Sequence, residues 1–141
     1  MRQYLLDTAP LVAYLQGRPT ARALIEPWRV RREVATSTIC YAEICEYLKS
    51  FSDFDRRRLH LRHLLQEVLP YSLTYVILER YADIRRSLRP PHGPGLIGDL
   101  DTLIAATAVE RNLTLVTTDR DYKRVPSLKL MLIERKDLRS S

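Results

Sequence analysis

The chain has 141 residues, of which 45% are hydrophobic and 28% charged, and this composition is typical of one globular domain with a sizeable core. Its net charge of +6 is compatible with a nucleic-acid partner and equally with a solvated surface, since charge bears on binding and not on fold. No long apolar run opens the sequence, and Asp7 interrupts the short one present, so we predict neither a signal peptide nor a membrane span. We predict a single domain over residues 1–141.

Strands and helices are expected to alternate along the chain. Runs of β-branched and other apolar residues predict strands at 2–7, 34–36, 68–70, 113–117 and 128–133. Helical spacing and capping residues predict a helix that starts over 8–10 and is closed by Gly17 and Pro19, followed by helices at 20–31, 39–48, 53–66, 74–88 and from Asp99 to about Asn112. Residues 89–95, rich in proline and glycine, form a loop, and the tail 135–141 is polar.

This alternation predicts an α/β fold, a parallel sheet with helices on both faces. In such sheets, ligands bind beyond the carboxyl ends of the strands. Asp7 and Asp119 lie at or just past the carboxyl end of a predicted strand, so both carboxylates should lie at the same edge of the sheet.

Cys40 and Cys45 lie five residues apart within one predicted helix, a spacing that disfavours a disulfide. We expect both to be buried thiols in a reducing compartment, which predicts a cytoplasmic protein.

Two carboxylates stand at the start of the helix that begins near Asp99. The rest of this helix is small or apolar, so negative charge there needs a nearby cation. Asp99 is a natural N-cap, where the helix dipole favours a carboxylate. Asp101, two residues later, is less well explained and is therefore the better candidate for a functional group.

Other acidic residues are candidates with ordinary alternatives. Asp7 could cap the helix that follows it. Glu43 and Glu46 lie on one helix with apolar neighbours, and one of the two should project from a buried face. Asp119 and Asp121 follow a strand, where either could simply begin a turn.

Taken together, Asp7, Glu43, Asp101 and Asp119 indicate a metal site. Carboxylates gathered without a basic residue among them stay ionised only around a bound cation. A set of oxygen ligands with no histidine or cysteine favours Mg²⁺ or Mn²⁺. Such a cation can activate water against a phosphodiester, and a basic periphery would hold the nucleic-acid backbone.

Four sequence blocks carry a resemblance to a known family. They are Leu5-Leu6-Asp7-Thr8, Thr38-x-x-x-Ala42-Glu43-Ile44, the run from Asp101 to Ala108, and the run from Leu115 to Tyr122. In this order and spacing the chain resembles PIN-domain proteins, and among them the VapC-type toxins of toxin–antitoxin pairs. The third and fourth blocks are the more specific ones.

The resemblance implies a three-layer α/β/α fold around a mainly parallel sheet, and a ribonuclease that depends on Mg²⁺ or Mn²⁺. The family's four acidic positions correspond to Asp7, Glu43, Asp101 and Asp119, and Thr117 corresponds to a conserved threonine that donates a hydrogen bond beside the metal ligands. The resemblance also implies a homodimer and an antitoxin partner that covers the acidic site. Asp99 is an additional carboxylate that could serve a second metal.

Arginines near the acidic helix are candidates for RNA contacts. Arg85, Arg86 and Arg89 lead into the loop before Asp99, and we predict that they contact phosphates. The arginines of the helix at 53–66 are scattered around it and fit a solvated face better.

Two other classes of protein are alternatives: another metal-using α/β domain and a non-catalytic binding module. A phosphoacceptor domain would need an acidic pair after the first strand, and a haloacid-type phosphatase would need a second aspartate where Ala9 stands. The other alternative is a non-catalytic PIN-like module that binds RNA or a protein. It would be favoured by the loss of a carboxylate, and none of the four is missing.

Overall fold

The computed structural model describes residues 1–139 and contains a five-stranded sheet with strand order β3-β2-β1-β4-β5. All neighbouring strands pair in parallel, as the alternation of strands and helices predicted. The strands are β1 (Tyr4–Leu6), β2 (Val34–Ser37), β3 (Leu69–Tyr71), β4 (Thr114–Thr117) and β5 (Lys129–Leu132). The strand order changes direction at β1, and this central strand ends one residue before Asp7.

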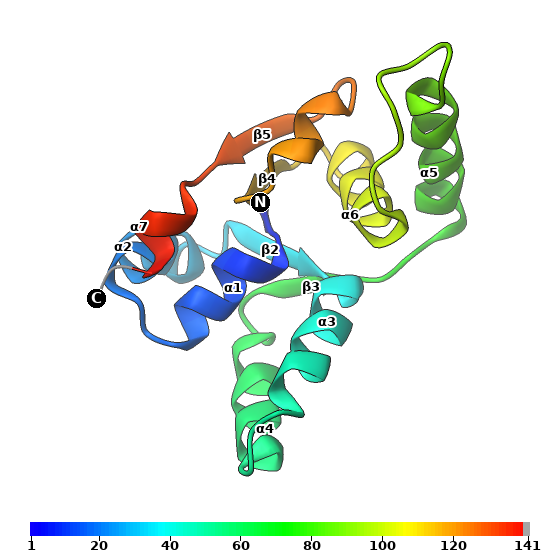
Figure 1. Ribbon diagram of the computed structural model, residues 1–141. Helices are drawn as coiled ribbons and strands as arrows, with labels where there is room; N and C mark the ends of the chain where they lie inside the picture. Colours follow the sequence, from blue (N-terminus) through cyan, green and yellow to red (C-terminus); the bar gives the residue numbers. More distant parts are fainter. Residues whose placement is uncertain (140–141) are drawn as a thin grey trace.

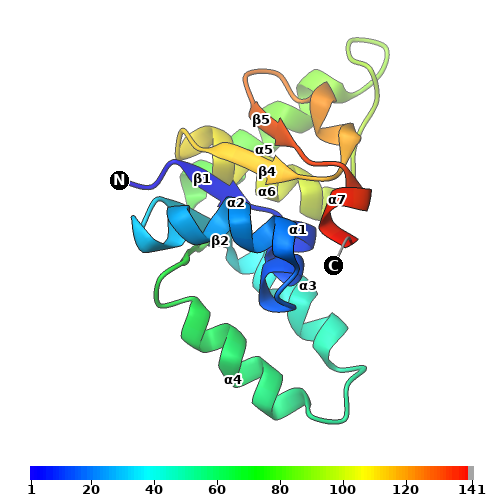
Figure 2. The same ribbon diagram turned by 90° about the vertical axis from the view of Figure 1, so that its left-hand side faces the viewer.

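Helices cover both faces of the sheet (Figure 1). They are α1 (Thr8–Leu15), α2 (Pro19–Val30), α3 (Thr38–Leu48), α4 (Phe54–Leu64), α5 (Tyr75–Leu88), α6 (Asp99–Glu110) and α7 (Arg135–Arg139), with a short 3₁₀ helix, η1, at Arg120–Arg124. Helices α5 and α6 lie on one side, and α1, α2 and α7 on the other. Helices α3 and α4 form a hairpin that extends away from the sheet, as Figure 2 shows from a second direction. None of the described helices is long and apolar enough to cross a bilayer.

Each central strand supplies side chains to two separate cores. Leu5 packs with the core under α5 and α6, whereas its neighbour Leu6 packs with the core under α1 and α2. Leu115 and Val116 on β4 divide in the same way, because successive side chains on a strand point to opposite faces. All four side chains are fully buried, so the strands on which the site is built are held from both sides.

Two stretches differ from the predictions. The tail, for which only a polar character was predicted, forms α7 over Arg135–Arg139, because Leu138 is 6% exposed and packs into the core under α1 and α2. Residues 140–141 of that predicted tail lie outside the described part of the chain. Helix η1 was also not expected. Its Tyr122 is 1% exposed, so burial of one aromatic ring holds this turn against the sheet.

Candidate metal and catalytic site

Asp7 occupies the end of the central strand. Its backbone N–H donates to the carbonyl of Val116 at 2.9 Å, which continues the β1–β4 ladder by one residue. Asp7 is also the residue before α1, but its side chain makes no capping hydrogen bond there. The capping role considered for Asp7 is therefore wrong: the carboxylate turns towards neighbouring strands and helices.

Thr117, the last residue of β4, connects two of the predicted carboxylates. Its hydroxyl donates to Asp7 Oδ2 at 2.6 Å and accepts a hydrogen bond from the backbone N–H of Asp119 at 3.1 Å. Thr117 is fully buried, so this single hydroxyl fixes the Asp7 carboxylate and the chain direction at Asp119 together. Asp119 Oδ1 in turn accepts from the backbone N–H of Asp121 at 2.9 Å, which starts η1.

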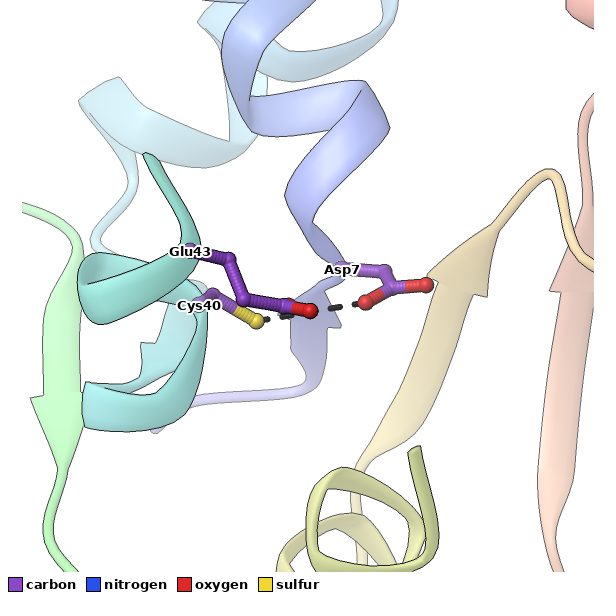
Figure 3. Close-up of side chains that lie close together, drawn as sticks. All are labelled: Asp7, Cys40 and Glu43. Atoms are coloured by element: carbon purple, nitrogen blue, oxygen red, sulfur yellow. Dashed lines mark hydrogen bonds between the residues drawn. The ribbon is translucent and has the colours of Figure 1, made fainter. Parts of the chain in front are cut away.

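Helix α3 contributes Glu43 and Cys40. Ser37 caps the helix by accepting from the backbone N–H of Ile39 at 3.0 Å. Cys40 and Glu43 are one turn apart, and both point towards Asp7 (Figure 3). The ligand atoms of Asp7, Cys40 and Glu43 all lie within 4.8 Å of one another.

Thr8 orients the Glu43 side chain. Its hydroxyl donates to Glu43 Oε1 at 2.6 Å, joining the start of α1 to α3. Glu46, which the sequence left as an alternative to Glu43, is exposed to solvent. The structure therefore selects Glu43 as the carboxylate that faces the sheet edge.

Asp101 enters the same region from the first turn of α6. The buried Tyr122 of η1 donates its hydroxyl proton to Asp101 Oδ1 at 3.1 Å. The helix begins after Gly98, which holds the N-cap position, and Thr102 closes the first turn by donating to the Gly98 carbonyl at 2.8 Å. The prediction that Asp99 is the N-cap is thus wrong.

A single cleft of about 550 Å³ gathers the four carboxylates. Asp7, Glu43, Asp101 and Asp119 all line it, although they are far apart in sequence and come from four different elements or their ends. The structure thus brings together the complete acidic set expected from the sequence. Asp121 is outside it, exposed and 3.6 Å from Arg124.

Two features of the surroundings of these carboxylates were not predicted. The expected ligand set holds no cysteine, and the Cys40 thiol lies 3.9 Å from Asp7 Oδ1. It was also expected to have no basic neighbours, but Arg18, Arg135 and Arg139 line the same cleft. Helix α7 brings in two of these arginines, and the sequence analysis, which predicted no helix in the tail, could not have placed them.

The electrostatics of the cleft disfavour charge on its buried groups. Burial raises the pKa of Asp7 to about 6, although the hydrogen bond from Thr117 opposes the change. Burial also raises the pKa of Asp101, with further contributions from the nearby Asp119 and Glu43 carboxylates. The pKa of the Cys40 thiol rises to about 12 for the same reason, so this sulfur is protonated at neutral pH.

This donor set fits a hard divalent cation. Mg²⁺ and Mn²⁺ prefer oxygen ligands, and the cleft offers four carboxylates. A protonated thiol is a poor ligand, since metals bind the thiolate. A cation among the carboxylates would also offset the burial that raises the pKa of Asp7 and Asp101.

The remaining predicted residues lie beside the cleft and do not line it. Asp99 is exposed and forms an ion pair with Arg85 of α5, to which the Tyr81 hydroxyl adds a contact of 3.5 Å. Arg85 is therefore engaged with a carboxylate, whereas Arg86 and Arg89 are exposed on α5 and at its C-terminal end. None of these four side chains lines the carboxylate cleft.

Sequence reasoning did not assign roles to Thr8, Cys40 or Tyr122. Thr8 and Tyr122 stand inside sequence blocks that carried the family resemblance, and this was the only signal that could have found them. Nothing in the sequence distinguished Cys40 from an ordinary buried thiol, because its position beside Asp7 depends on how α3 packs on β1.

The fold and the site define a parallel α/β domain with a cleft of carboxylates at the carboxyl edge of its sheet. The family model of the PIN domain matches residues 4–128, and the chain therefore belongs to the PIN-domain family. No protein with a curated description matches the sequence.

Solved structures share the fold over nearly the whole chain. VapBC2 from Rickettsia felis, bound to a DNA fragment from its promoter, aligns with a TM-score of 0.80 and 24% identity, covering 93% of this chain and 98% of that one. DNA-bound VapBC from Salmonella typhimurium aligns with a TM-score of 0.81 and 19% identity, with the same coverage. VapBC-5 from Mycobacterium tuberculosis is described as a member of a family of toxin–antitoxin systems. It aligns with a TM-score of 0.67 and 22% identity, covering 95% of this chain and 99% of that one.

Proposed function

We propose that this single PIN domain is a metal-dependent ribonuclease that cleaves RNA phosphodiester bonds. The observation that carries the proposal is the convergence of Asp7, Glu43, Asp101 and Asp119 on one cleft. Membership of the PIN-domain family and the resemblance of all four sequence blocks support the same activity. We assign Asp7, Asp101, Glu43 and Asp119 as ligands of Mg²⁺ or Mn²⁺, with Thr117 as the residue that positions Asp7.

The divalent cation would polarise the scissile phosphate and activate the attacking water. The protein's part is to hold its carboxylates in place before substrate arrives. Thr117 orients Asp7, Thr8 orients Glu43 and Tyr122 orients Asp101, each through one hydroxyl donor. Three carboxylates fixed in this way need little rearrangement when charge develops on the phosphate, which is the basis of preorganised catalysis.

We further propose that the protein is the toxin of a toxin–antitoxin pair, that it acts in the cytoplasm and that it forms a homodimer. The three structural relatives described above are VapBC complexes, and one is described as part of a toxin–antitoxin system. An antitoxin would inhibit the enzyme by covering the carboxylate cleft. Both cysteines are free, which fits a reducing compartment.

The test is cleavage of total RNA by the purified protein with Mg²⁺, with Mn²⁺ and with EDTA, beside Asp101→Asn. We expect cleavage only with a divalent cation, and a loss of about 100-fold or more in the variant, because charge stabilisation by a metal is worth several kcal/mol. Glu46→Gln, a change to an exposed acid on α3 outside the cleft, is the matched control and should cleave normally. Cleavage that persists in EDTA or in Asp101→Asn would contradict the assignment.

The alternative is a PIN-like module that binds RNA or protein without cleaving it. No cleavage by a folded protein free of antitoxin, together with RNA binding that Asp101→Asn leaves unchanged, would favour that alternative.

A further inference from the structure

We propose that α7 and the residues before it form a binding subsite for the phosphate backbone of single-stranded RNA. In this subsite, Arg135 and Arg139 contact nucleotides next to those held at the carboxylates. The inference rests on the proposed ribonuclease function and adds to it the path of the substrate and the side chains that hold it.

Helix α7 is anchored so that its arginines face the site. Leu138 is 6% exposed and packs in the core under α1 and α2, and α7 contacts both of these helices. Arg135 and Arg139 are four residues apart and therefore lie on the same side of the helix. Both line the carboxylate cleft.

A second hollow of about 450 Å³ adjoins the carboxylate cleft. Four residues line both spaces: Thr118, Asp119, Arg135 and Arg139. Arg120 and Lys136 add positive charge to the second hollow alone, where Glu134 also lies and pairs with Arg120 at 3.6 Å. A path therefore leads from the carboxylates, past Asp119 and along α7, into a space where basic side chains outnumber acidic ones.

The arginines beside the carboxylates are not used to neutralise them. Within residues 1–139, Arg18, Arg135 and Arg139 form no ion pair with any carboxylate, although four carboxylates line the same cleft. Arg85 of α5, by contrast, is paired with Asp99. Arg135 and Arg139 are exposed and hold their charge available for an external anion.

RNA is the anion that this arrangement favours. Four carboxylates alone would repel a polyanion, so a strand whose phosphate enters the cleft needs cations immediately beside it. Arginine presents several N–H donors in a planar fork that matches phosphate oxygens. Helix α7 places the guanidinium groups of Arg135 and Arg139 in the same cleft as Asp119. By contrast, Arg85, Arg86 and Arg89 do not line this cleft.

The test measures RNA binding separately from cleavage. Asp101→Asn is used as the parent so that a fluorescein-labelled oligouridylate stays intact, and its affinity is followed by anisotropy in Mg²⁺ over a range of KCl concentrations. We expect Arg135→Gln/Arg139→Gln to weaken binding and to reduce the slope of log K against log[KCl] by about 1.4, because each phosphate contact on a single strand contributes about 0.7.

Two variants control for charge and for folding. Arg58→Gln/Arg62→Gln removes the same charge from two positions four residues apart on α4, which lies away from α7 in both views (Figures 1 and 2), and should leave the slope unchanged. Arg135→Lys/Arg139→Lys keeps both charges and should keep the slope. An unchanged slope in Arg135→Gln/Arg139→Gln, or an equal loss in the α4 variant, overturns the subsite.

The outcomes separate this inference from the proposed function. RNA cleavage by the wild-type protein with an unchanged slope in the α7 variant would refute the subsite alone. A wild-type protein that neither binds nor cleaves RNA would refute both. If the α7 variant keeps RNA binding but loses binding to a polyglutamate peptide, α7 is a surface for an acidic protein and the RNA subsite is wrong.

Discussion

Two groups of acidic side chains in this protein have opposite electrostatic environments. In the carboxylate cleft, Asp7 is buried without a cationic partner, and its pKa rises to about 6. Across α1, Glu26 contacts Arg29 and the Tyr14 hydroxyl, and these hydrogen bonds lower the pKa of Glu26 to about 2. Arg29 also pairs with Glu67 at 2.6 Å, so one guanidinium serves two carboxylates.

This difference in counter-charge separates a structural network around Arg29 from the carboxylate cleft, the candidate functional site. The Arg29 network, formed by Tyr14, Glu26, Arg29 and Glu67, carries its own counter-charge and stabilises contacts between α1, α2 and the segment before β3. Among the described residues, the carboxylates of the cleft have no paired cation. The folded protein is therefore less stable when Asp7 and Asp101 are ionised. Sites that keep unfavourable charge are expected where a ligand supplies the compensation.

Asp7→Asn should stabilise the metal-free protein while abolishing metal-dependent activity. The pKa of about 6 means that the ionised carboxylate lowers the free energy of unfolding by about 3 kcal/mol near pH 8, since each pKa unit is worth about 1.4 kcal/mol. Asparagine keeps an oxygen that can accept from Thr117. The measurement is urea unfolding in EDTA at pH 8. A destabilised variant would show that Asp7 is not under electrostatic strain.

The pH dependence of stability should have opposite signs in the two groups. Because the folded pKa of Asp7 lies above its usual 3.8, its contribution favours folding at low pH and is lost as pH rises through about 6. Glu26 has a lowered pKa, so its contribution is present above about 4.5 and is lost as pH falls towards 2. Wild type and Asp7→Asn, unfolded in EDTA, should therefore be similarly stable near pH 4, diverge between pH 4 and about 6, and keep a constant difference above that.

Thr117→Val should lower RNA cleavage by about 10-fold to 100-fold, the usual cost of removing a hydrogen-bond partner of a metal ligand. The variant loses the donor to Asp7 and the acceptor for the Asp119 N–H together. Thr117→Ser keeps the hydroxyl and should retain most of the activity. If the valine and serine variants cleave RNA equally well, Thr117 does not position Asp7.

Arg29→Met should cost about 1 kcal/mol of unfolding free energy, because it leaves Glu26 and Glu67 without their shared cation at a partly exposed site. The loss should shrink as pH falls towards 2, where Glu26 becomes protonated, and RNA cleavage should not change. Denaturant unfolding at two pH values measures this. A loss of cleavage would mean that the Arg29 network and the carboxylate cleft are coupled, and the contrast between them would fail.

The sequence anticipated much of the site because its carboxylates are tied to local signals. Asp7 and Asp119 follow strands, and parallel strands end at one edge of a sheet, so their proximity was predictable. Glu43 and Asp101 were found through apolar surroundings and through the family resemblance. The surroundings were harder to predict: Cys40, Thr8 and Tyr122 act through packing between α3, α1 and η1, which no local pattern specifies.

The alternation of strands and helices and the parallel sheet were predictable because hydrophobic periodicity and the ends of strands are local properties, and the family resemblance completed the four acidic positions. Packing between distant elements settled which glutamate of α3 faces the cleft, that Gly98 and not Asp99 caps α6, and that Arg85 is engaged by Asp99. It also decided that residues 135–139 form a helix that brings Arg135 and Arg139 to the carboxylates. These outcomes depend on burial of single side chains such as Leu138, whose helix contacts α1 and α2 more than 100 residues earlier in the chain.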